Sequence, residues 1–312
     1  MDALLSLNLA NKYVWIDVLC NNQHLAGKTK QKRWFEIFEK AVRKIGRVVV
    51  VLAPYDRPVY VTRAWCVFET LTAIDVKAEY DVVFPPKQKH AFVEAMRKGM
   101  GVAAFMKIFG DINVANCQAA NESDRLAIVG RIGKRTDVND ALMLRLKKFY
   151  KKTALEAVAG IPGTSTADAR AFDATACLHQ ALGDLERALP WFQRALKTHQ
   201  HGGSGSSEPD QATALNNIAS CLRDQGKFEE ALKYHYEALA IRKRALGDDH
   251  PDVATSLNNI ASCLSDMGKY DEALERQREA HDIYVRVHGH DHPAVATSLN
   301  NIASCLSDMG KY

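Results

Sequence analysis

Several classes of protein are excluded by what this sequence lacks. It contains no run of about 18 apolar residues, so no transmembrane helix is predicted. Its N-terminus has no basic segment followed by an apolar one, which is the pattern of a secretory signal. The seven cysteines are an odd number and form no Cys-x-x-Cys pair, which argues against a disulfide framework. We therefore expect a cytoplasmic protein that does not insert into membranes.

Motifs for phosphate, metal and nucleic acid are also missing. Neither G-x-G-x-x-G nor G-x-x-x-x-G-K-[ST] occurs, so no phosphate-binding loop is available. His288, His290 and His292 stand together, but the equivalent turn at 246–250 holds one histidine, so we predict no metal site. Residues 1–158 contain 26 Lys and Arg against 16 Asp and Glu, and residues 159–312 contain 15 against 21. Neither half has a basic stripe interleaved with aromatics, so nucleic-acid binding is not predicted.

A repeat of 42 residues dominates the C-terminal half. Residues 250–270 read HPDVATSLNNIASCLSDMGKY, and residues 292–312 differ from them only at Asp252, where Ala294 stands. A third copy, EPDQATALNNIASCLRDQGKF, occupies 208–228, and a degenerate fourth copy lies upstream at an offset of 43. Three cysteines recur with this period, which is typical of a small buried residue copied with a repeat: Cys221, Cys263 and Cys305.

Each repeat is predicted to hold two helices. Leu257, Ile260, Ala261 and Leu264 follow the i, i+3, i+4, i+7 spacing of an amphipathic first helix. Gly268 ends that helix, and a second helix is expected over 270–287. Because one such pair cannot bury its apolar face alone, neighbouring pairs must stack into a solenoid.

These residues resemble the tetratricopeptide repeat (TPR) of the kinesin-light-chain type, with its HP start, LNNxA first helix and GKYxEA turn. The resemblance implies an all-α TPR superhelix over 159–312, with units at about 166–201, 208–246, 250–288 and 292–312, the last incomplete. It also implies a protein or peptide partner held in a concave groove. No sustained heptad pattern accompanies the repeats, so a motor subunit itself is not predicted.

By the family's pattern, one polar set per repeat should line this groove. An asparagine ladder carries donors and acceptors, so it suits the backbone of an extended peptide. The other interpretation is that Asn217, Asn259 and Asn301 join neighbouring helices by hydrogen bonds. In that case the asparagine ladder contacts water and binds no partner. The predicted groove residues are Asn216, Asn258, Asn300, Ser220, Ser262, Ser304, Asp224, Asp266 and Asp308.

The N-terminal half, 1–158, has the pattern of an α/β domain with a parallel sheet. Apolar strands are predicted at 13–19, 47–53 and 80–84. Helices are predicted at 33–45, 63–74, 86–98, 121–132 and 137–158. Strands that alternate with helices favour a sheet covered on both faces.

Two blocks suggest a site in this domain. The segment WIDVLCNNQ places Asp17 and Asn22 at the carboxyl end of a strand, where open α/β sheets bind ligands. The segment RAWCVFE opens a helix with Trp65 and Cys66, followed by Glu69. Together the blocks resemble the Toll/interleukin-1-receptor (TIR)-like superfamily, which includes fungal heterokaryon-incompatibility (HET) domains. That resemblance implies a partial flavodoxin-like fold and makes Glu69 the candidate catalytic carboxylate.

Two functions remain open. One is a scaffold or adaptor whose repeats bind a partner and whose α/β domain self-associates, with no cofactor. The alternative is a TIR-like enzyme that hydrolyses NAD and senses a ligand through its repeats. TIR folds have a strand and a helix ahead of the YVWID strand, and this sequence has only 12 residues there, so we expect that element to be missing. Because the final unit stops at its turn, we also expect the sequence to be a fragment.

Overall fold

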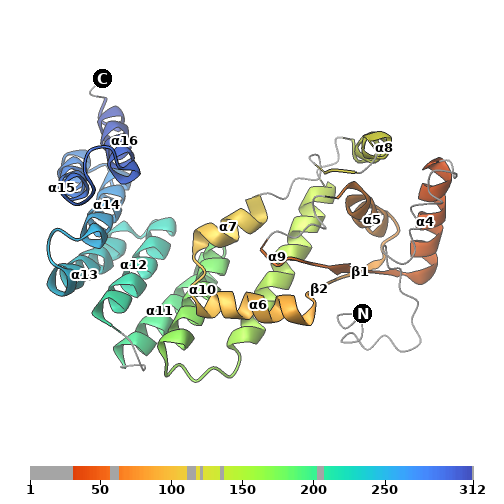
Figure 1. Cartoon of the computed structure of the whole chain (residues 1–312), viewed down its shortest axis with the longest axis horizontal. Helices are drawn as coiled ribbons and strands as arrows, with labels where there is room; N and C mark the ends of the chain where they lie inside the picture. Colours follow the sequence, from red (N-terminus) through yellow and green to blue (C-terminus); the bar gives the residue numbers. More distant parts are fainter. Residues whose placement is uncertain are drawn as a thin grey trace. The chain divides into compact units, whose positions relative to one another are not determined.

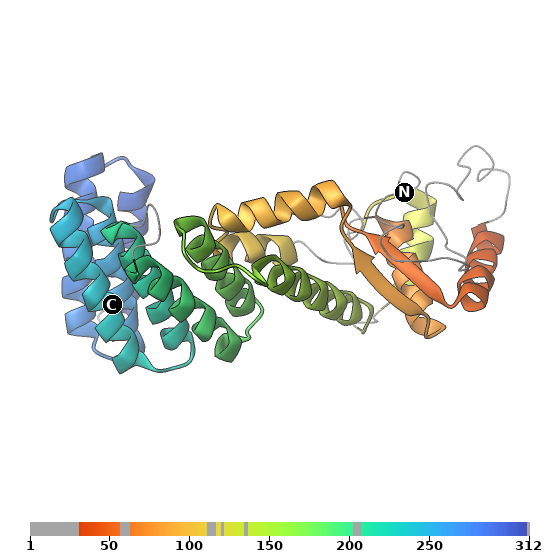
Figure 2. The same ribbon diagram turned by 90° about the horizontal axis from the view of Figure 1, so that it is seen from below.

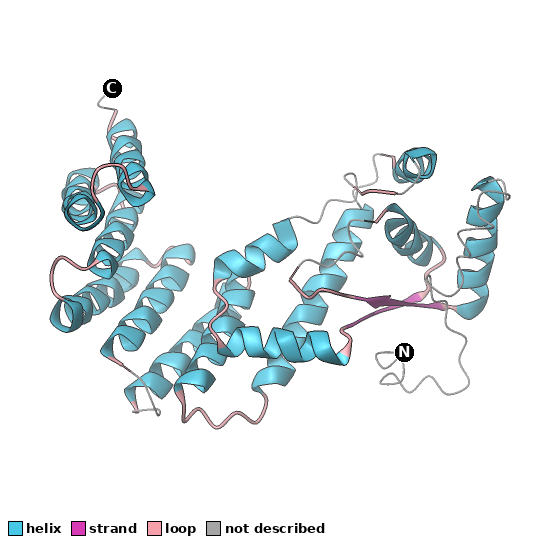
Figure 3. Cartoon of the chain, in the orientation of Figure 1, coloured by secondary structure: helices cyan, strands magenta, loops and turns pink. Residues whose placement is uncertain are grey.

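The computed structural model describes residues 31–56, 63–110, 117–119, 122–133, 137–201 and 207–310. The chain divides into two compact units, Met1–Ala95 with Ala103–Ala157, and Met96–Val102 with Val158–Tyr312. Helices make up most of both units, and two short strands lie in the first (Figure 3).

The first unit is built around a pair of parallel strands. Strand β1 (Arg47–Val51) pairs with β2 (Glu79–Val83), and helix α5 (Ala64–Asp75) connects them. The other helices of the N-terminal half are, in chain order, α4 (Gln31–Ile45), α6 (Pro86–Arg97), α7 (Val102–Gly110), α8 (Glu122–Ile132) and α9 (Asp137–Val158). The parallel pairing and the connecting helix agree with the α/β pattern.

The predicted α/β fold is only partly confirmed. The helices and the two later strands lie within two residues of the predicted bounds, but the strand expected at 13–19 lies outside the described residues. Two strands alone do not establish a TIR-like sheet, so that fold is not confirmed. Helix α7 was not predicted, although Phe105, Ile108 and Phe109 follow helical spacing and are buried.

Aromatic side chains form much of the core of the first unit. The buried ring of Tyr150 on α9 lies 5.4–5.6 Å from the rings of Phe84, Phe92 and Phe109, in edge-on arrangements. Its hydroxyl donates a hydrogen bond to the carbonyl of Tyr55 at 2.5 Å, and burial raises its pKa. A buried tyrosine needs such a partner, and this one joins α9 to the segment after β1.

Among the described residues, seven helices of the second unit form the repeats, and from α10 to α16 each helix packs against the next (Figures 1 and 2). First helices alternate with second helices, as predicted. They are α10 (Thr166–Ala181), α11 (Leu185–Gln200), α12 (Glu208–Asp224), α13 (Phe228–Leu246), α14 (Pro251–Asp266), α15 (Tyr270–His288) and α16 (Pro293–Asp308).

Specific residues start and stop these helices. Ser207 and Asp210 form a reciprocal capping box at the start of α12, whereas His250 caps α14 by accepting a hydrogen bond from the Asp252 amide at 3.1 Å. After α14 the backbone of Gly268 adopts a φ of 75°, which favours glycine and turns the chain into α15.

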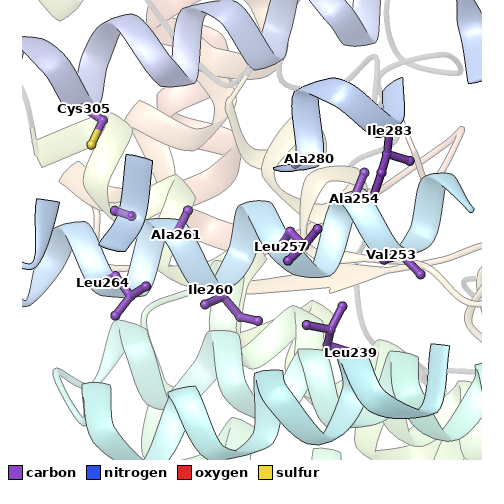
Figure 4. Packing of buried hydrophobic residues seen from close by; sticks show 11 residues of the cluster. Leu239, Val253, Ala254, Leu257, Ile260, Ala261, Leu264, Ala280, Ile283 and Cys305 are labelled. Carbon is purple, nitrogen blue, oxygen red and sulfur yellow. The ribbon is translucent and has the colours of Figure 1, made fainter. Parts of the chain in front are cut away.

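Helix α14 shows how a repeat is held together (Figure 4). The predicted stripe of Leu257, Ile260, Ala261 and Leu264 is buried, with Leu239 of α13 against one side of the helix. On the other side lies α15, which contributes Ala273 and Ala280 together with Ile283. Alanine lets the two helices approach closely, and α14 is enclosed by the second helices α13 and α15.

The repeated cysteines join consecutive repeats. All six cysteines in the described part of the chain are free thiols. The thiols of Cys221, Cys263 and Cys305 each donate to a carbonyl at the start of the preceding second helix, at 3.4–3.6 Å. Burial raises the pKa of Cys221 to about 11, so its thiol remains a protonated donor. The prediction of a small buried residue rather than a disulfide is confirmed.

A buried polar network joins α12, α13 and α14. The Oδ1 atom of Asn216 accepts from His235 Nδ1 at 2.8 Å, and its Nδ2 donates to Ser256 Oγ at 3.4 Å. The guanidinium of Arg242 donates to the same Ser256 Oγ at 2.8 Å and to the Asp252 carbonyl at 3.0 Å. The Nε atom of Arg242 is buried without a hydrogen-bond partner among the described residues, so this network is satisfied only in part.

The next repeat lacks this network. Gln277 and Tyr284 stand where His235 and Arg242 stand one repeat earlier. The buried atoms Asn258 Oδ1 and Gln277 Oε1 have no hydrogen-bond partner among the described residues. The two repeats have nearly the same first helix, but their second helices differ in sequence and therefore satisfy the buried polar groups differently.

We predict that Leu257→Ala and Leu299→Ala have very different effects, although the two leucines have identical neighbours in sequence. Leu257 is 0% exposed and Leu299 is 51% exposed. The first substitution should lower the free energy of unfolding by about 2–5 kcal/mol and the second by less than about 1 kcal/mol. Urea unfolding followed by circular dichroism measures both, and equal losses would contradict the packing described.

His235 should make the protein acid-sensitive. Burial, helped by the charges of Arg223 and Arg242, lowers its pKa from 6.5 to about 4. At pH values between about 4 and 6.5, His235 is protonated in the unfolded chain to a greater extent than in the folded protein. The free energy of unfolding therefore falls as the pH decreases through this range. At pH 5 the loss attributable to His235 should be roughly 1–2 kcal/mol.

The matched variant is His235→Gln, because glutamine is the natural residue at the equivalent position 277. Urea unfolding at pH 7 and pH 5 should show a smaller difference between the two pH values for this variant than for the wild type. An equal difference would show that His235 titrates normally in the folded protein.

Candidate functional site

The proposed catalytic carboxylate, Glu69, lies on a helix that is buried around most of its surface. Glu69 is 8% exposed, and Cys66, Thr70 and Ala73 on the same helix are also buried. The rings of Phe35 and Phe38 on α4 lie 4.6 and 5.5 Å from the ring of Phe68. This burial follows from the apolar composition of α5, AWCVFETLTAID, and it places Glu69 in a core environment.

The structure does not test whether the other members of this predicted site lie near Glu69. Asp17 and Asn22 lie outside the described residues. Trp65 lies in the first turn of α5, and its side chain is outside the description. The α/β-domain site, with Glu69 and Cys66 as its two buried members, therefore stays a prediction.

A small cavity of about 190 Å³ opens beside α5, and Glu69 is not among the residues that line it. Its lining combines Phe68 and Thr72 with Glu39, Asp75 and Arg131. The Arg131 guanidinium lies 4.2 Å from the centre of the Phe35 ring, a cation–π contact. Cofactor pockets usually measure about 300–1,000 Å³, so this cavity is too small to hold a dinucleotide.

The first helices of the repeats present a second candidate surface. In α12, α14 and α16 the same four polar residue types recur at i, i+4, i+7 and i+11, which places them along one face of each helix. All of them are exposed or half-buried. We call this set the polar face: Thr213, Asn217, Ser220 and Asp224; Thr255, Asn259, Ser262 and Asp266; and Thr297, Asn301, Ser304 and Asp308.

The predicted asparagine ladder is not uniform. Asn216 is buried in the network with His235 and Ser256, Asn258 is half-buried, and Asn300 is exposed. The amide of Asn216 is therefore already occupied by contacts within the protein. The predicted serines and aspartates, in contrast, all belong to the polar face as just defined.

Contacts between neighbouring first helices run along this face. Gln180 Nε2 on α10 donates to Asp224 on α12 at 2.7 Å, and Arg223 Nε on α12 donates to Asp266 on α14 at 2.5 Å. Asn217 Nδ2 lies 3.5 Å from an oxygen of Asp173, at the limit of a hydrogen bond, which fits the alternative interpretation of a helix tie at this position. Polar residues here therefore connect repeats as well as face solvent.

Sequence reasoning missed Asp173, Gln180 and Arg223 as members of this surface. Asp173 occupies the position of Asn216 in the degenerate unit, where Phe172, Asp173 and Ala174 stand in place of LNN. Desolvation and the charge of Asp210 raise the pKa of Asp173 to about 7, although the hydrogen bond from Asn217 opposes this. The sequence feature that could have identified Asp173 is the offset of 43 residues between the units, which aligns Asp173 with Asn216.

The described residues hold no group of three or more His, Cys, Asp or Glu side chains that could bind a metal ion. His288 and His292 stack with ring centres 4.2 Å apart, and this contact packs the turn between α15 and α16. No helix in the described ranges is long and apolar enough to cross a membrane.

Comparison with known proteins gives a clear result for the repeats. Models of the tetratricopeptide repeat match residues 210–284 and 252–312, and a second such model matches residues 174–245. No curated protein matches the sequence.

Solved structures show weak likeness to the chain. BtubC (BKLC) from P. vanneervenii has 17% identity and a TM-score of 0.46, over 71% of this chain and 84% of that one. A Podosopora anserina protein, named for kinesin light chain and its nearly identical TPR-like repeats, has 16% identity and a TM-score of 0.46, over 62% and 90%. The apo form of RapI has 13% identity and a TM-score of 0.42, over 79% and 61%.

The family matches agree with the helix pairs, the glycine turns and the stacked apolar stripes of the second unit. Residues 174–312 of this chain are tetratricopeptide repeats.

Proposed function

We propose that the repeat unit is a protein-interaction scaffold that binds an extended segment of a partner along the polar face of its first helices. Tetratricopeptide-repeat proteins are generally scaffolds of this kind, which supports the class of function. The single observation that carries the choice of surface is the recurrence of the same exposed or half-buried Thr, Asn, Ser and Asp in three helices.

The chemistry of the polar face suits a peptide backbone. Hydroxyl and amide groups both donate and accept hydrogen bonds, so they can pair with N–H and C=O groups whatever the partner's side chains are. Consecutive first helices are near enough for side chains of their polar faces to hydrogen-bond, as Gln180 does with Asp224 and Arg223 with Asp266. An extended chain rises about 3.3 Å per residue, so one partner segment of several residues would reach more than one polar set.

The structure changes which residues should carry this binding. Asn216 is occupied by His235 and Ser256, so it is assigned to packing between repeats. The serines, Ser220, Ser262 and Ser304, lie in the middle of each polar set and become the central residues of the proposed surface. Asp266 contributes less, because it already pairs with Arg223.

Three finer hypotheses stay predictions. A role like that of kinesin light chain is supported by the HP, LNN and GKY motifs. Self-association through the first unit and hydrolysis of NAD are supported only by the resemblance of two sequence blocks. The burial of Glu69 does not favour the enzyme.

A peptide selection tests the scaffold proposal. A phage-displayed library of 12-residue peptides is selected on the full chain, and the best binders are measured by fluorescence anisotropy. Ser262→Arg should weaken binding by about tenfold or more, because the larger side chain obstructs the face. Ser304→Arg, at an exposed position, should do the same without a risk to folding.

The matched control is Glu237→Arg, which puts the same side chain at an exposed position of second helix α13. It should leave the affinity within about twofold. If the selection yields no binder, or if Glu237→Arg and the two serine variants weaken binding equally, the polar face is not the binding surface.

A further inference from the structure

Two aspartates at equivalent positions of the polar face have different partners on the preceding first helix. Asp224 on α12 accepts a hydrogen bond from Gln180 of α10, and Asp266 on α14 accepts one from Arg223 of α12. Gln180 and Arg223 are themselves at equivalent positions, 43 residues apart. The same site in two successive repeats is therefore occupied once by a neutral amide and once by a guanidinium.

The two sites consequently differ in charge. Arg223 Nε lies 2.5 Å from Asp266 Oδ2, so this carboxylate is neutralised by an ion pair. An amide carries no net charge, so the hydrogen bond from Gln180 leaves the negative charge of Asp224 uncompensated. Among the described residues no ion pair includes Asp224, and its side chain is exposed. A carboxylate also has acceptor positions beyond the one that Gln180 uses.

The positions of the two aspartates in the array are comparable. Helix α12 contacts first helices α10 and α14. Helix α14 contacts α12, and Ser265 on α14 reaches α16 with its Oγ 4.0 Å from Cys305 Sγ. Both aspartates thus lie on a first helix that has another first helix on either side. The difference between them therefore comes from the residue that faces each one from the preceding helix.

The charge of the repeats favours a basic partner. Residues 159–312 contain 15 Lys and Arg against 21 Asp and Glu. A surface with this balance attracts a positively charged segment and speeds its association. The pair of Arg223 with Asp266 shows in addition that a guanidinium fits against an aspartate at this position of the polar face.

We propose that Asp224 binds an arginine side chain of the partner segment, in the way that Asp266 binds Arg223. This inference rests on the proposed function and adds to it the chemistry of the partner, an extended segment with an arginine that lies against the end of α12. Arginine is favoured over lysine because its planar guanidinium can donate two parallel hydrogen bonds to one carboxylate. Asp266 imposes no such requirement, because Arg223 already neutralises it.

Peptide selection on three forms of the full chain tests this assignment. The library of 12-residue peptides is selected in parallel on the wild type, Asp224→Asn and Gln180→Arg, and the selected pools are sequenced. Asparagine keeps an acceptor for Gln180 but removes the charge, whereas Gln180→Arg gives α10 the residue that α12 has at position 223. The wild-type pool should be enriched in arginine by about threefold or more over the input library, and both variants should lose this enrichment.

A double-mutant cycle then measures the pair directly. The best wild-type binder is synthesised with citrulline, a neutral isostere of arginine, at the enriched position. By fluorescence anisotropy, citrulline should weaken binding to the wild type by about three- to tenfold and binding to Asp224→Asn by less than about twofold. The matched control is Asp266→Asn, which removes the same charge one repeat later and should leave the citrulline effect as it is in the wild type.

Failure of this inference and failure of the proposed function give different results. Binders without arginine enrichment, or an equal citrulline effect on the wild type and on Asp224→Asn, would exclude the arginine site and leave the scaffold function intact. A selection that yields no binder would overturn both proposals. A citrulline effect that is lost in Asp266→Asn but kept in Asp224→Asn would place the arginine at Asp266, contrary to the assignment.

Discussion

The structure of the repeat unit depends on one packing constraint, the enclosure of the first helices α12 and α14 between two second helices. In α14 this enclosure buries all four residues of the apolar stripe, Ala254, Leu257, Ile260 and Leu264. Leu239 of α13 lies on one side of the helix, and Ala273 and Ala280 of α15 lie on the other. Alanine is needed where helices approach closely, whereas leucine and isoleucine fill the remaining volume. Because the apolar sides of the helix are covered, its polar residues are left on the one face that still reaches solvent.

This constraint links packing to function. The repeated Thr, Asn, Ser and Asp of α12, α14 and α16 are exposed or half-buried in each helix, because the equivalent cysteines, Cys221, Cys263 and Cys305, are buried against the preceding second helix in all three. A row of equivalent polar sets at the spacing of packed helices is a periodic surface, which suits a partner with a periodic backbone. The contacts of Gln180 with Asp224 and of Arg223 with Asp266 hold neighbouring helices in register along the same face.

Near-identity in sequence does not produce identity in environment. Leu257 and Leu299 lie within the same local sequence, yet among the described helices Leu257 has second helices on both sides and Leu299 has α15 on one. Asn216 and Asn258 are equivalent by repeat, yet only Asn216 meets a histidine, because position 277 holds glutamine. Differences of this kind give each repeat its own stability and its own surface.

The amphipathic spacing and the HP, LNN and GKY motifs were sufficient to predict the helix pairs of the repeats, their turns and the burial of Cys221, Cys263 and Cys305. These features depend on residues within one or two helical turns, which a sequence displays directly. The burial of Asn216 depends on Ser256, 40 residues away, and on His235 of another helix. The pairing of Asp173 with Asn217 likewise depends on which helix lies beside each residue. Only the tertiary structure decided these points, because the environment of a side chain is set by neighbours that local periodicity does not identify.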